Sequence, residues 1–355
     1  MEKLDYWWQH PADPLTEELI QAATNHQNQL TKPQGSLGRL ETIAIQMAGI
    51  QNTLNPHCDQ VAITIFAGDH GIVAEGVSAF PQAVTTEMLK NFVTGGAAIS
   101  VLSRTINAKL EVINVGSLAD PAALPDVNHQ VVARGTANFA HQAAMTEAQL
   151  DQALQVGKDV IDQCSQNNVN LWLGGEMGIG NTTAASAIIS ELLEKDAAQV
   201  VGPGTGLSQQ GVNHKADVIA AALSKHQGQL TSPSKVLQYV GGFEIAALTG
   251  AYIRAAQLRI ASVVDGFICG AAALAAMRMN PSIAPYLLFS HRSAEPGHQL
   301  LLDGINREPI VDLTLRLGEG SGAAIVVPLI QMAVNLHNQM ATFATAGVSE
   351  KLESE

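Results

Sequence analysis

Residues 61–71 read Val61-Ala62-Ile63-Thr64-Ile65-Phe66-Ala67-Gly68-Asp69-His70-Gly71. A run of mostly β-branched and aromatic residues predicts a strand buried on both faces, and the glycine with two polar residues predicts its end. The same pattern, an apolar run followed by glycine or a polar group, recurs along the chain. It predicts further strands at positions 109–115, 169–173, 236–240, 262–264 and 286–289.

Helical stretches of suitable length separate many of these runs, at 82–92, 146–166, 182–194, 210–223 and 244–256. Strands that alternate with helices are typical of an α/β fold in which right-handed crossovers join parallel strands. We therefore predict a doubly wound, mainly parallel sheet flanked by helices.

Both ends of the chain are predicted to be helical. One helix is expected at 15–30, a second is expected to be capped by Ser36 and to run to Ile50, and the last is expected at about 322–336. We expect the last helix to pack with the first two. This predicts a small helical domain formed by residues 1–55 with 325–355, and an α/β catalytic domain formed by residues 56–324.

The bulk composition restricts the class of protein. The chain has 355 residues, 46% hydrophobic and 14% charged, as in a well-packed globular protein. A formal net charge of −13 argues against a nucleic acid or an anionic membrane as partner. Cys58, Cys164 and Cys269 have no paired spacing and fit buried thiols in a reducing compartment. No leader is visible at the start, and a strand followed by a buried helix explains the apolar run 260–277, so we expect a cytoplasmic protein.

The polar motifs lie, almost without exception, where predicted strands end, and open parallel sheets bind their ligands at that edge. One of them, Gly178-Ile179-Gly180-Asn181-Thr182, follows a strand and opens an alanine-rich helix. Free amides at a helix start, glycines that allow close approach, and the Asn181 and Thr182 side chains suit a phosphate group. An ordinary helix cap after a tight turn is the alternative.

A second glycine-rich loop, at 200–206, contains Gly202 and Gly204, and Lys215 lies in the helix that follows it. In a protein of net negative charge, a lysine near a glycine loop is a reasonable partner for a phosphate. The alternative for Lys215 is an exposed helix lysine.

Two acids lie between glycine and apolar residues. Glu319 lies between Gly318 and Gly320, and Glu176 follows Gly175. Loss of solvation raises the pKa of such a carboxyl towards the range in which it accepts a proton near neutral pH. The two could divide the roles of base and orienting group. The alternative for Glu319 is a place in the first turn of a helix capped by Ser321.

Histidines invite a metal interpretation at Asp69-His70, His291 and His298. No H-E-x-x-H or C-x-x-C spacing supports it, and a catalytic zinc site needs three converging ligands. No G-x-S-x-G turn or activated cysteine suggests a covalent nucleophile. We expect neither a metal nor a cofactor.

Together, these motifs are similar to those of the nicotinate-nucleotide–dimethylbenzimidazole phosphoribosyltransferases, which build the lower ligand of cobalamin. The resemblance covers nearly the whole chain and runs through Lys32-Pro33-Gln34-Gly35-Ser36-Leu37-Gly38, Gly68-Asp69-His70-Gly71, Gly175-Glu176-Met177-Gly178-Ile179-Gly180-Asn181-Thr182-Thr183, Gly241-Gly242-Phe243-Glu244, Asp265-Gly266-Phe267, Ser290-His291-Arg292-Ser293-Ala294-Glu295 and Leu317-Gly318-Glu319-Gly320-Ser321-Gly322.

The resemblance implies a reaction. Such enzymes move the 5-phosphoribosyl group of nicotinate mononucleotide onto a nitrogen of 5,6-dimethylbenzimidazole, which gives α-ribazole 5′-phosphate and nicotinate with inversion at C1′. Because nicotinate leaves from a pyridinium, no pyrophosphate has to be neutralised and the usual reason for magnesium is absent. The family also implies a homodimer.

The resemblance also implies roles for individual residues. Glu319 is similar to the general base, Glu176 to the second acid beside the nucleotide, and the loop from Gly178 to Thr182 with Lys215 to the phosphate site. The remaining residues expected to bind substrate are Gly202, Gly204, Met177 and Ser293, with Ser78, Pro81, Gln82 and Leu317 bordering the flat base. The base-preference region is expected around 78–82 and Met88.

Two other functions fit the sequence less well. A nicotinamide-dependent oxidoreductase would need the dinucleotide fingerprint, which is missing. A nucleotide-binding sensor without catalysis is the second alternative, and the presence of both Glu176 and Glu319 argues against it.

Overall fold

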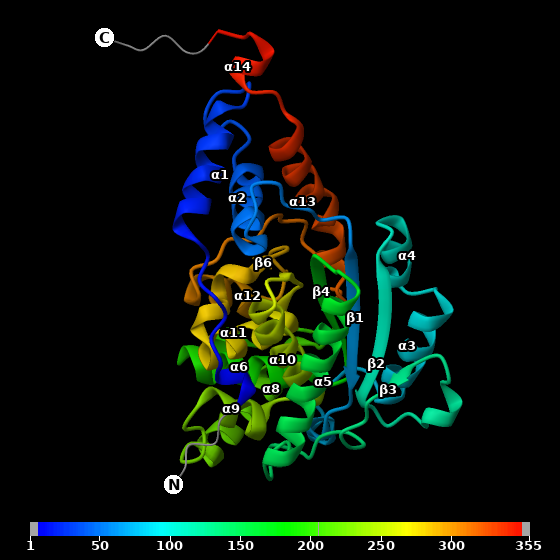
Figure 1. The fold of residues 1–355 in the computed structure, drawn as a ribbon. Helices are drawn as coiled ribbons and strands as arrows, with labels where there is room; N and C mark the ends of the chain where they lie inside the picture. The colour runs from blue at the N-terminus through cyan, green and yellow to red at the C-terminus, as the bar shows by residue number, and fades with distance from the viewer. Residues whose placement is uncertain (1–5, 205, 350–355) are drawn as a thin grey trace.

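The computed structural model describes residues 6–204 and 206–349, and within them six parallel strands form one sheet in the order β3-β2-β1-β4-β5-β6 (Figure 1). The strand order reverses beside β1, as in a doubly wound fold. The strands are β1 (Val61–Gly68), β2 (Lys109–Gly116), β3 (Asn128–His129), β4 (Leu171–Met177), β5 (Ala261–Val264) and β6 (Leu287–Phe289). The predicted α/β class with a mainly parallel sheet is confirmed.

One predicted strand is wrong. Residues 236–240 belong to a helix, α9 (Pro233–Val240). The Ser232 hydroxyl accepts a hydrogen bond from the Lys235 amide, and proline occupies the first helical position, which together start a helix. The apolar residues Val236, Leu237 and Val240 are buried along one helical face. Their run was too short to separate a buried strand from a buried helix.

The predicted helices are present with shifted ends. The helices are α1 (Glu17–Gln29), α2 (Arg39–Gln51), α3 (Ala83–Thr94), α4 (Ala98–Thr105), α5 (Glu147–Gln166), α6 (Asn181–Leu193), α7 (Ala197–Val200), α8 (Gln209–His226), α10 (Phe243–Gln257), α11 (Phe267–Met279), α12 (Pro296–Gly304), α13 (Ser321–Gln339) and α14 (Phe343–Ala346). Ser36 does not cap α2, because Gly38 occupies the N-cap position. Short 3-10 helices lie at Trp7–Gln9, Gly71–Glu75, Pro121–Ala123 and Pro281–Tyr286.

Helices cover both faces of the sheet, and two neighbouring glycines of β4 show why they can. A Cβ on Gly174 would lie 2.6 Å from Leu248 of α10, whereas a Cβ on Gly175 would lie 2.8 Å from the Gly320 amide, next to the start of α13. Successive residues of a strand face opposite sides of a sheet. The two glycines therefore let α10 approach one face and the segment before α13 approach the other.

Helices α5 and α10 pack closely against each other beside the sheet. Gly157 of α5 has no room for a side chain, since a Cβ there would overlap the Ala247 carbonyl and lie 2.7 Å from the Ala251 amide. Gly250 of α10 meets the backbone of Leu154 in the same way. This backbone contact lets the alanine-rich helix α10 fit between α5 and the central strands.

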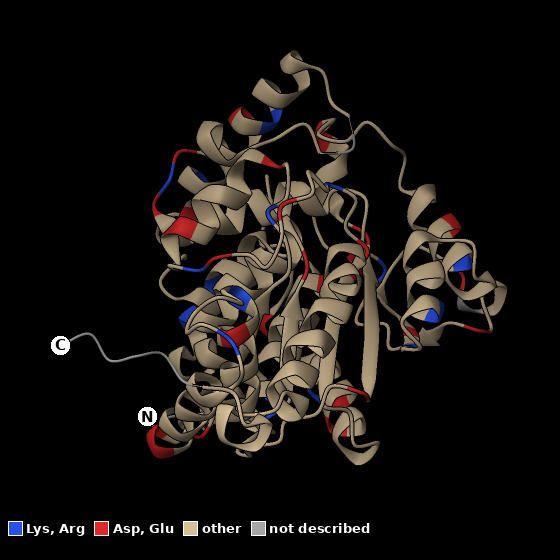
Figure 2. Cartoon of the chain, turned by 90° about the horizontal axis from the view of Figure 1, so that it is seen from above, with Lys and Arg blue, Asp and Glu red and all other residues tan. Residues whose placement is uncertain are grey.

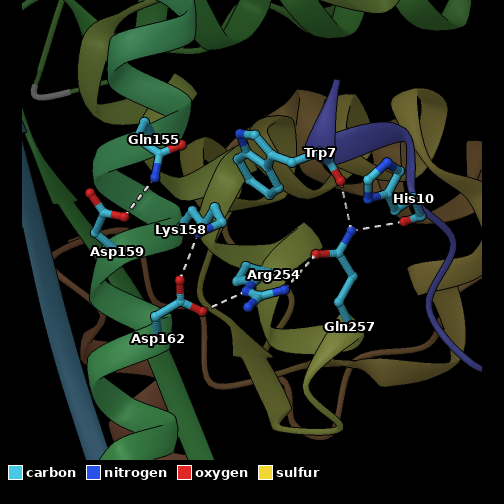
Figure 3. A network of polar contacts seen from close by, with 8 residues as sticks. All are labelled: Trp7, His10, Gln155, Lys158, Asp159, Asp162, Arg254 and Gln257. Carbon is cyan, nitrogen blue, oxygen red and sulfur yellow. Dashed lines mark hydrogen bonds and ion pairs between the residues drawn. The ribbon is translucent and has the colours of Figure 1, made fainter. Parts of the chain in front are cut away.

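The N-terminal segment is tied to these two helices by a polar network (Figure 3). Gln257 donates hydrogen bonds to the carbonyls of Trp7 and His10, at 3.0 and 2.8 Å. Asp162 of α5 pairs with Lys158 at 2.7 Å and with Arg254 of α10 at 2.6 Å. Arg254 also donates to Gln257 at 3.4 Å, so the side chain that holds the N-terminal segment is itself linked to the α5–α10 ion pair.

The first and last helices pack together at one end of the molecule (Figure 1). Helix α13 contacts α2, and an antiparallel bridge joins Leu30 to Thr342. The expected packing of the last helix with the N-terminal helices is therefore present. The division into two domains stays a prediction, and residues 1–5 and 350–355 of the expected helical domain lie outside the described residues.

The apolar run 260–277 forms β5 and the buried helix α11, as expected. Among the described residues, no helix is long and apolar enough to span a membrane. Figure 2 shows lysines and arginines scattered over several elements and interspersed with acids.

The α5–α10 contact generates a stability prediction. Gly157→Ala should lower the free energy of unfolding by roughly 1–3 kcal/mol, the usual cost of overpacking, because the added methyl group meets backbone atoms that cannot turn away. Denaturant unfolding measures the change. Gly228→Ala is the matched control, since a Cβ there meets nothing within 4 Å. Equal stability of the two variants would contradict the close contact.

Candidate active site

A cavity of about 230 Å³ lies at the carboxyl ends of β4 and β5. Its wall comes from α3 and the turn before it, from the segment between β4 and α6, from the start of α11, and from the segment before α13. Ten of the residues predicted from the sequence line it: Met88, Glu176, Met177, Gly178, Asn181, Thr182, Gly204, Ser293, Leu317 and Glu319.

Glu319 is held in a left-handed backbone conformation, with φ of 62°, between Gly318 and Gly320, which are also left-handed. It precedes α13, whose N-cap is Gly320, so the alternative of a first-turn residue capped by Ser321 is wrong. The Ser321 hydroxyl instead donates to the Gly318 carbonyl at 2.6 Å. An αL conformation is costly for a residue such as glutamate, and backbone strain of this kind is often found at active sites.

The electrostatics of Glu319 suit a proton acceptor. Burial, followed by the nearby Asp265 carboxyl, raises the pKa of Glu319 to about 7. Within the described chain, its Oε2 atom has no hydrogen-bond partner. This oxygen is buried, but Glu319 as a residue lines the cavity, so a bound molecule can lie beside its carboxyl group.

Asp265 anchors the segment that carries Glu319. It lies directly after β5, and its Oδ1 accepts a hydrogen bond from the Ala323 amide at 2.8 Å. Gly320 has no side chain to cap α13, so a residue distant in sequence supplies the acceptor that the first turn needs.

Glu176 is the second carboxyl of the cavity wall. It is buried at the end of β4, accepts a hydrogen bond from the Asn181 side chain, and accepts one from the backbone of Glu319. Burial, with smaller contributions from Asp265 and Glu244, raises its pKa to about 8. Gly318 makes room for it, since a Cβ there would lie 2.5 Å from Glu176 Oε1.

The glycine loop, residues 178–180, leads from β4 into α6. Gly180 is the N-cap of α6 with φ of 99°, and Gly178 packs so closely on the Gly68 carbonyl that a Cβ would overlap it. The loop thus brings the first turn of α6 to the cavity, where Asn181 and Thr182 are exposed to it. The predicted loop between a strand and a helix start is present.

Lys215 of α8 is almost completely buried, with 1% of its surface exposed, so the alternative of an exposed helix lysine is wrong. Its Nζ donates to the Thr182 hydroxyl at 2.7 Å. Burial lowers the pKa of Lys215 to about 8, against the opposing influence of Glu295. A cation held beside the first turn of α6 is suited to an anion.

Several predicted residues lie just behind the wall of the cavity. Gly180 and Lys215 support it through the glycine loop and Thr182. Gly202 makes room for Glu295, whose carboxylate also accepts a hydrogen bond from the Gly204 backbone. Thr205 of the same glycine-rich loop lies outside the described residues.

Three residues expected beside the base do not line the cavity: Ser78, Pro81 and Gln82. The Ser78 hydroxyl donates to the Phe80 carbonyl within its own turn, and the Gln82 side chain donates to the His70 carbonyl. Phe80, which lies between them in the sequence, lines the cavity instead and is 45% exposed.

Sequence reasoning missed part of the wall. Val84, Ile268 and Arg316 were not singled out, and Phe267 and Glu295 stood only inside quoted motifs; all five line the cavity. The signal for Val84 was its spacing of four residues from Met88, which places both on one face of α3. No comparable signal pointed to Ile268.

The histidines near the site have structural partners. His70 bonds to Glu244 at 2.7 Å, and both side chains are fully buried. His298 Nδ1 accepts from the Ser293 amide at 2.8 Å, and burial lowers its pKa to about 3, which keeps the ring neutral. In the described part of the chain, no group of three or more His, Cys, Asp or Glu side chains could hold a metal ion.

Comparisons with known proteins add to this geometry. A family model described as "Phosphoribosyltransferase" matches residues 12–348. A nicotinate-nucleotide–dimethylbenzimidazole phosphoribosyltransferase of Pseudomonas putida strain W619 is 55% identical over 345 residues, which cover 97% of this chain and 98% of the relative. One of Pseudomonas fluorescens strain SBW25 is 53% identical over 347 residues, or 98% of this chain and 99% of the relative.

Solved structures agree. A crystal structure of the enzyme with this name from Thermus thermophilus superposes with a TM-score of 0.89 at 38% identity and covers 94% of this chain and 99% of its own. A structure of CobT from the same organism gives a TM-score of 0.90 at 39% identity, with 94% of this chain and 100% of that chain covered. The chain belongs to the nicotinate-nucleotide–dimethylbenzimidazole phosphoribosyltransferase family.

Proposed function

We propose that this chain transfers the 5-phosphoribosyl group of nicotinate mononucleotide to 5,6-dimethylbenzimidazole and releases nicotinate and α-ribazole 5′-phosphate. The observation that carries the proposal is Glu319, a carboxyl in the wall of a mostly apolar cavity, whose pKa burial raises to about 7 and whose buried Oε2 has no hydrogen-bond partner among the described residues. The names of the relatives support the same reaction.

The nucleotide phosphate is assigned to the start of α6. The glycine loop allows a close approach of backbone amides, Thr182 offers a hydroxyl, and Lys215 supplies a buried positive charge. Burial lowers the pKa of Lys215, and a phosphate dianion beside it would raise that pKa back towards its ordinary value. Gly204 and Ser293 complete the edge of the cavity on this side.

The acceptor base is assigned to the apolar part of the cavity. Phe80, Val84 and Met88 form one wall, and Leu317 and Met177 contribute from the others. A flat, uncharged ring system buries its faces against such side chains and needs few polar contacts. The ring nitrogens can then be directed at C1′ and at Glu319.

The reaction needs one proton acceptor. One nitrogen of the base attacks C1′ while the bond from C1′ to the pyridinium nitrogen breaks, and its electron pair neutralises the departing nicotinate ring. The other base nitrogen loses its proton to Glu319. Glu176 is assigned the orienting role, since its bonds to Asn181 and to the Glu319 backbone hold both sides of the cavity.

Three further assignments stay proposals. Ser78, Pro81 and Gln82 are assigned to shaping the turn that presents Phe80. Gly202 is assigned to accommodating Glu295. The active form is proposed to be a homodimer, which sedimentation analysis of the protein would test.

The function itself is tested by incubating the protein with nicotinate mononucleotide and 5,6-dimethylbenzimidazole and following nicotinate release. We expect stoichiometric formation of nicotinate and of the phosphoribosylated base. Exhaustive chelation before the assay should leave the rate unchanged, since the leaving group carries no phosphate that a metal must neutralise. Binding of the nucleotide without turnover would support the sensor alternative, and a rate restored by magnesium would contradict metal independence.

Glu319→Gln should lower kcat by about 10²–10⁴-fold, the usual contribution of a general base, because the amide cannot accept the proton. In the unchanged protein, kcat should fall as pH decreases through about 7, where Glu319 becomes protonated. The folded-state pKa of Glu319 lies above its ordinary value, so its ionisation destabilises the fold above about pH 4.5. The variant should therefore melt at the same or a higher temperature at pH 8. Near-normal kcat in the variant would move the base elsewhere.

Lys215→Met should raise the KM for nicotinate mononucleotide by roughly 10–100-fold, since a charge-assisted contact contributes about 1.5–3 kcal/mol. The same change should increase stability at pH 7, because replacing a buried charge by an apolar group is often stabilising by ~1–3 kcal/mol.

The sign of the pH dependence follows from the folded pKa of about 8, which lies below the ordinary 10.5. Between these values the unfolded chain binds more protons, so the contribution of Lys215 to stability improves as pH rises. The difference in melting temperature between the two proteins should shrink from pH 7 to pH 10. A melting-temperature difference that stays constant over this pH range would show that Lys215 titrates at its ordinary pKa.

A further inference from the structure

A buried hydroxyl lies between two walls of the cavity. Thr85 belongs to α3, the helix that also contributes Val84 and Met88, and its side chain has no exposed surface. Its Oγ1 accepts a hydrogen bond from the backbone amide of Ile179 at 3.1 Å. Ile179 is the middle residue of the glycine loop. Thr85 therefore links the wall formed by α3 directly to the glycine loop.

Asp69 determines which way the Thr85 hydroxyl points. Thr85 Oγ1 donates to Asp69 Oδ1 at 2.7 Å, and Asp69 Oδ2 accepts from the Leu118 amide at 2.8 Å. A hydroxyl has one proton, so donating it to Asp69 leaves the lone pairs for the Ile179 amide. Asp69 follows β1 directly and is fully buried. The sheet thus fixes the hydroxyl through a charge-assisted hydrogen bond.

The glycine loop depends on such a link. Gly178 and Gly180 have no side chains to pack, and glycine is the residue with the most backbone freedom. Gly178 rests on the Gly68 carbonyl, and a Cβ on Gly180 would lie 3.0 Å from His70 Cβ. These two contacts restrict the movement of the loop on the side that faces β1 and His70. The Ile179 amide, in the middle of the loop, is the group that Thr85 holds in place from the side of α3.

We propose that Thr85 is a positioning residue that sets the glycine loop against α3, and so fixes the nucleotide phosphate relative to the acceptor base. The inference rests on the proposed function, since it uses the assignment of the two substrates to these two walls. Thr85 does not line the cavity and acts only through Ile179 and Asp69.

The test compares Thr85→Val, which keeps the shape and removes the hydroxyl, with Thr85→Ser, which keeps the hydroxyl. Thr85→Val leaves the Ile179 amide and Asp69 Oδ1 without this partner, so the loop should lose its fixed position. We expect the KM for nicotinate mononucleotide to rise about tenfold, with kcat and the KM for the base each changed by less than about threefold. Thr85→Ser should stay within about twofold of the unchanged protein.

Thr249→Val is the matched control. Thr249 is a fully buried threonine of α10 whose hydroxyl donates to the carbonyls of Ile245 and Ala272, between α10 and α11. Its loss should lower the melting temperature without changing either KM. Unchanged KM values in Thr85→Val, or a Thr85→Ser variant as impaired as Thr85→Val, would overturn the inference. If Thr85→Val does not fold, Thr85→Ala makes the same comparison.

Calorimetric titration with nicotinate mononucleotide alone separates this inference from the proposed function. The unchanged protein should bind the nucleotide, and Thr85→Val should bind it about tenfold more weakly. If the unchanged protein neither binds the nucleotide nor releases nicotinate, the proposed function fails. If it does both, and Thr85→Val binds equally tightly, only the role of Thr85 fails.

Discussion

The approach of two backbones at Gly175 makes the rest of the site possible. A Cβ on Gly175 would lie 2.8 Å from the Gly320 amide and 2.9 Å from the carbonyl carbon of Glu319. With glycine on β4, the segment before α13 lies directly on the central sheet, and Glu319 comes within reach of Glu176. Any side chain at this position would lift α13 from the strand, and the two carboxyls would separate.

This close packing places several acidic side chains in buried positions near one another. Glu176, Asp265 and Glu319 are buried around the ends of β4 and β5, and Glu244 is buried beside the end of β1. Neighbouring charges raise the pKa values of Glu176 and Glu319 further. The protein offsets the cost with specific donors. Glu244 bonds to His70, Asp265 to the Ala323 amide and Glu176 to Asn181. Glu319 combines an unpartnered oxygen with a place in the cavity wall, which is the combination that proton transfer needs.

Much of the fold and part of the site could be predicted from local patterns. The strands that begin at 61, 109, 171 and 261 are largely apolar runs followed by glycine or polar residues, and this repeated pattern defined the ligand edge. The pattern failed at α9, because a five-residue apolar run carries no period and the deciding signal, Ser232 with Pro233, lay before it. The burial of Lys215 could not be predicted either, since it depends on how α8 packs against α6. The link from Asp69 through Thr85 to Ile179 joins three distant segments, and no local pattern contains such information.

The pairing of α2 with α13 has a consequence for synthesis on the ribosome. The apolar residues of α2, including Ile43, Met47 and Ile50, are buried in the finished protein, and α13 is one of the elements that cover this helix. Helix α13 begins about 270 residues after α2 ends. At roughly 5–20 residues per second, the ribosome needs ~14–54 s to deliver it. During that time α2 lacks this partner, and Glu319, which immediately precedes α13, is among the last parts of the site to be made. The last strand, β6, ends only about 30 residues before Glu319, so the proposed base follows the complete sheet by roughly 1.5–6 s, whereas α2 waits for α13 about nine times as long.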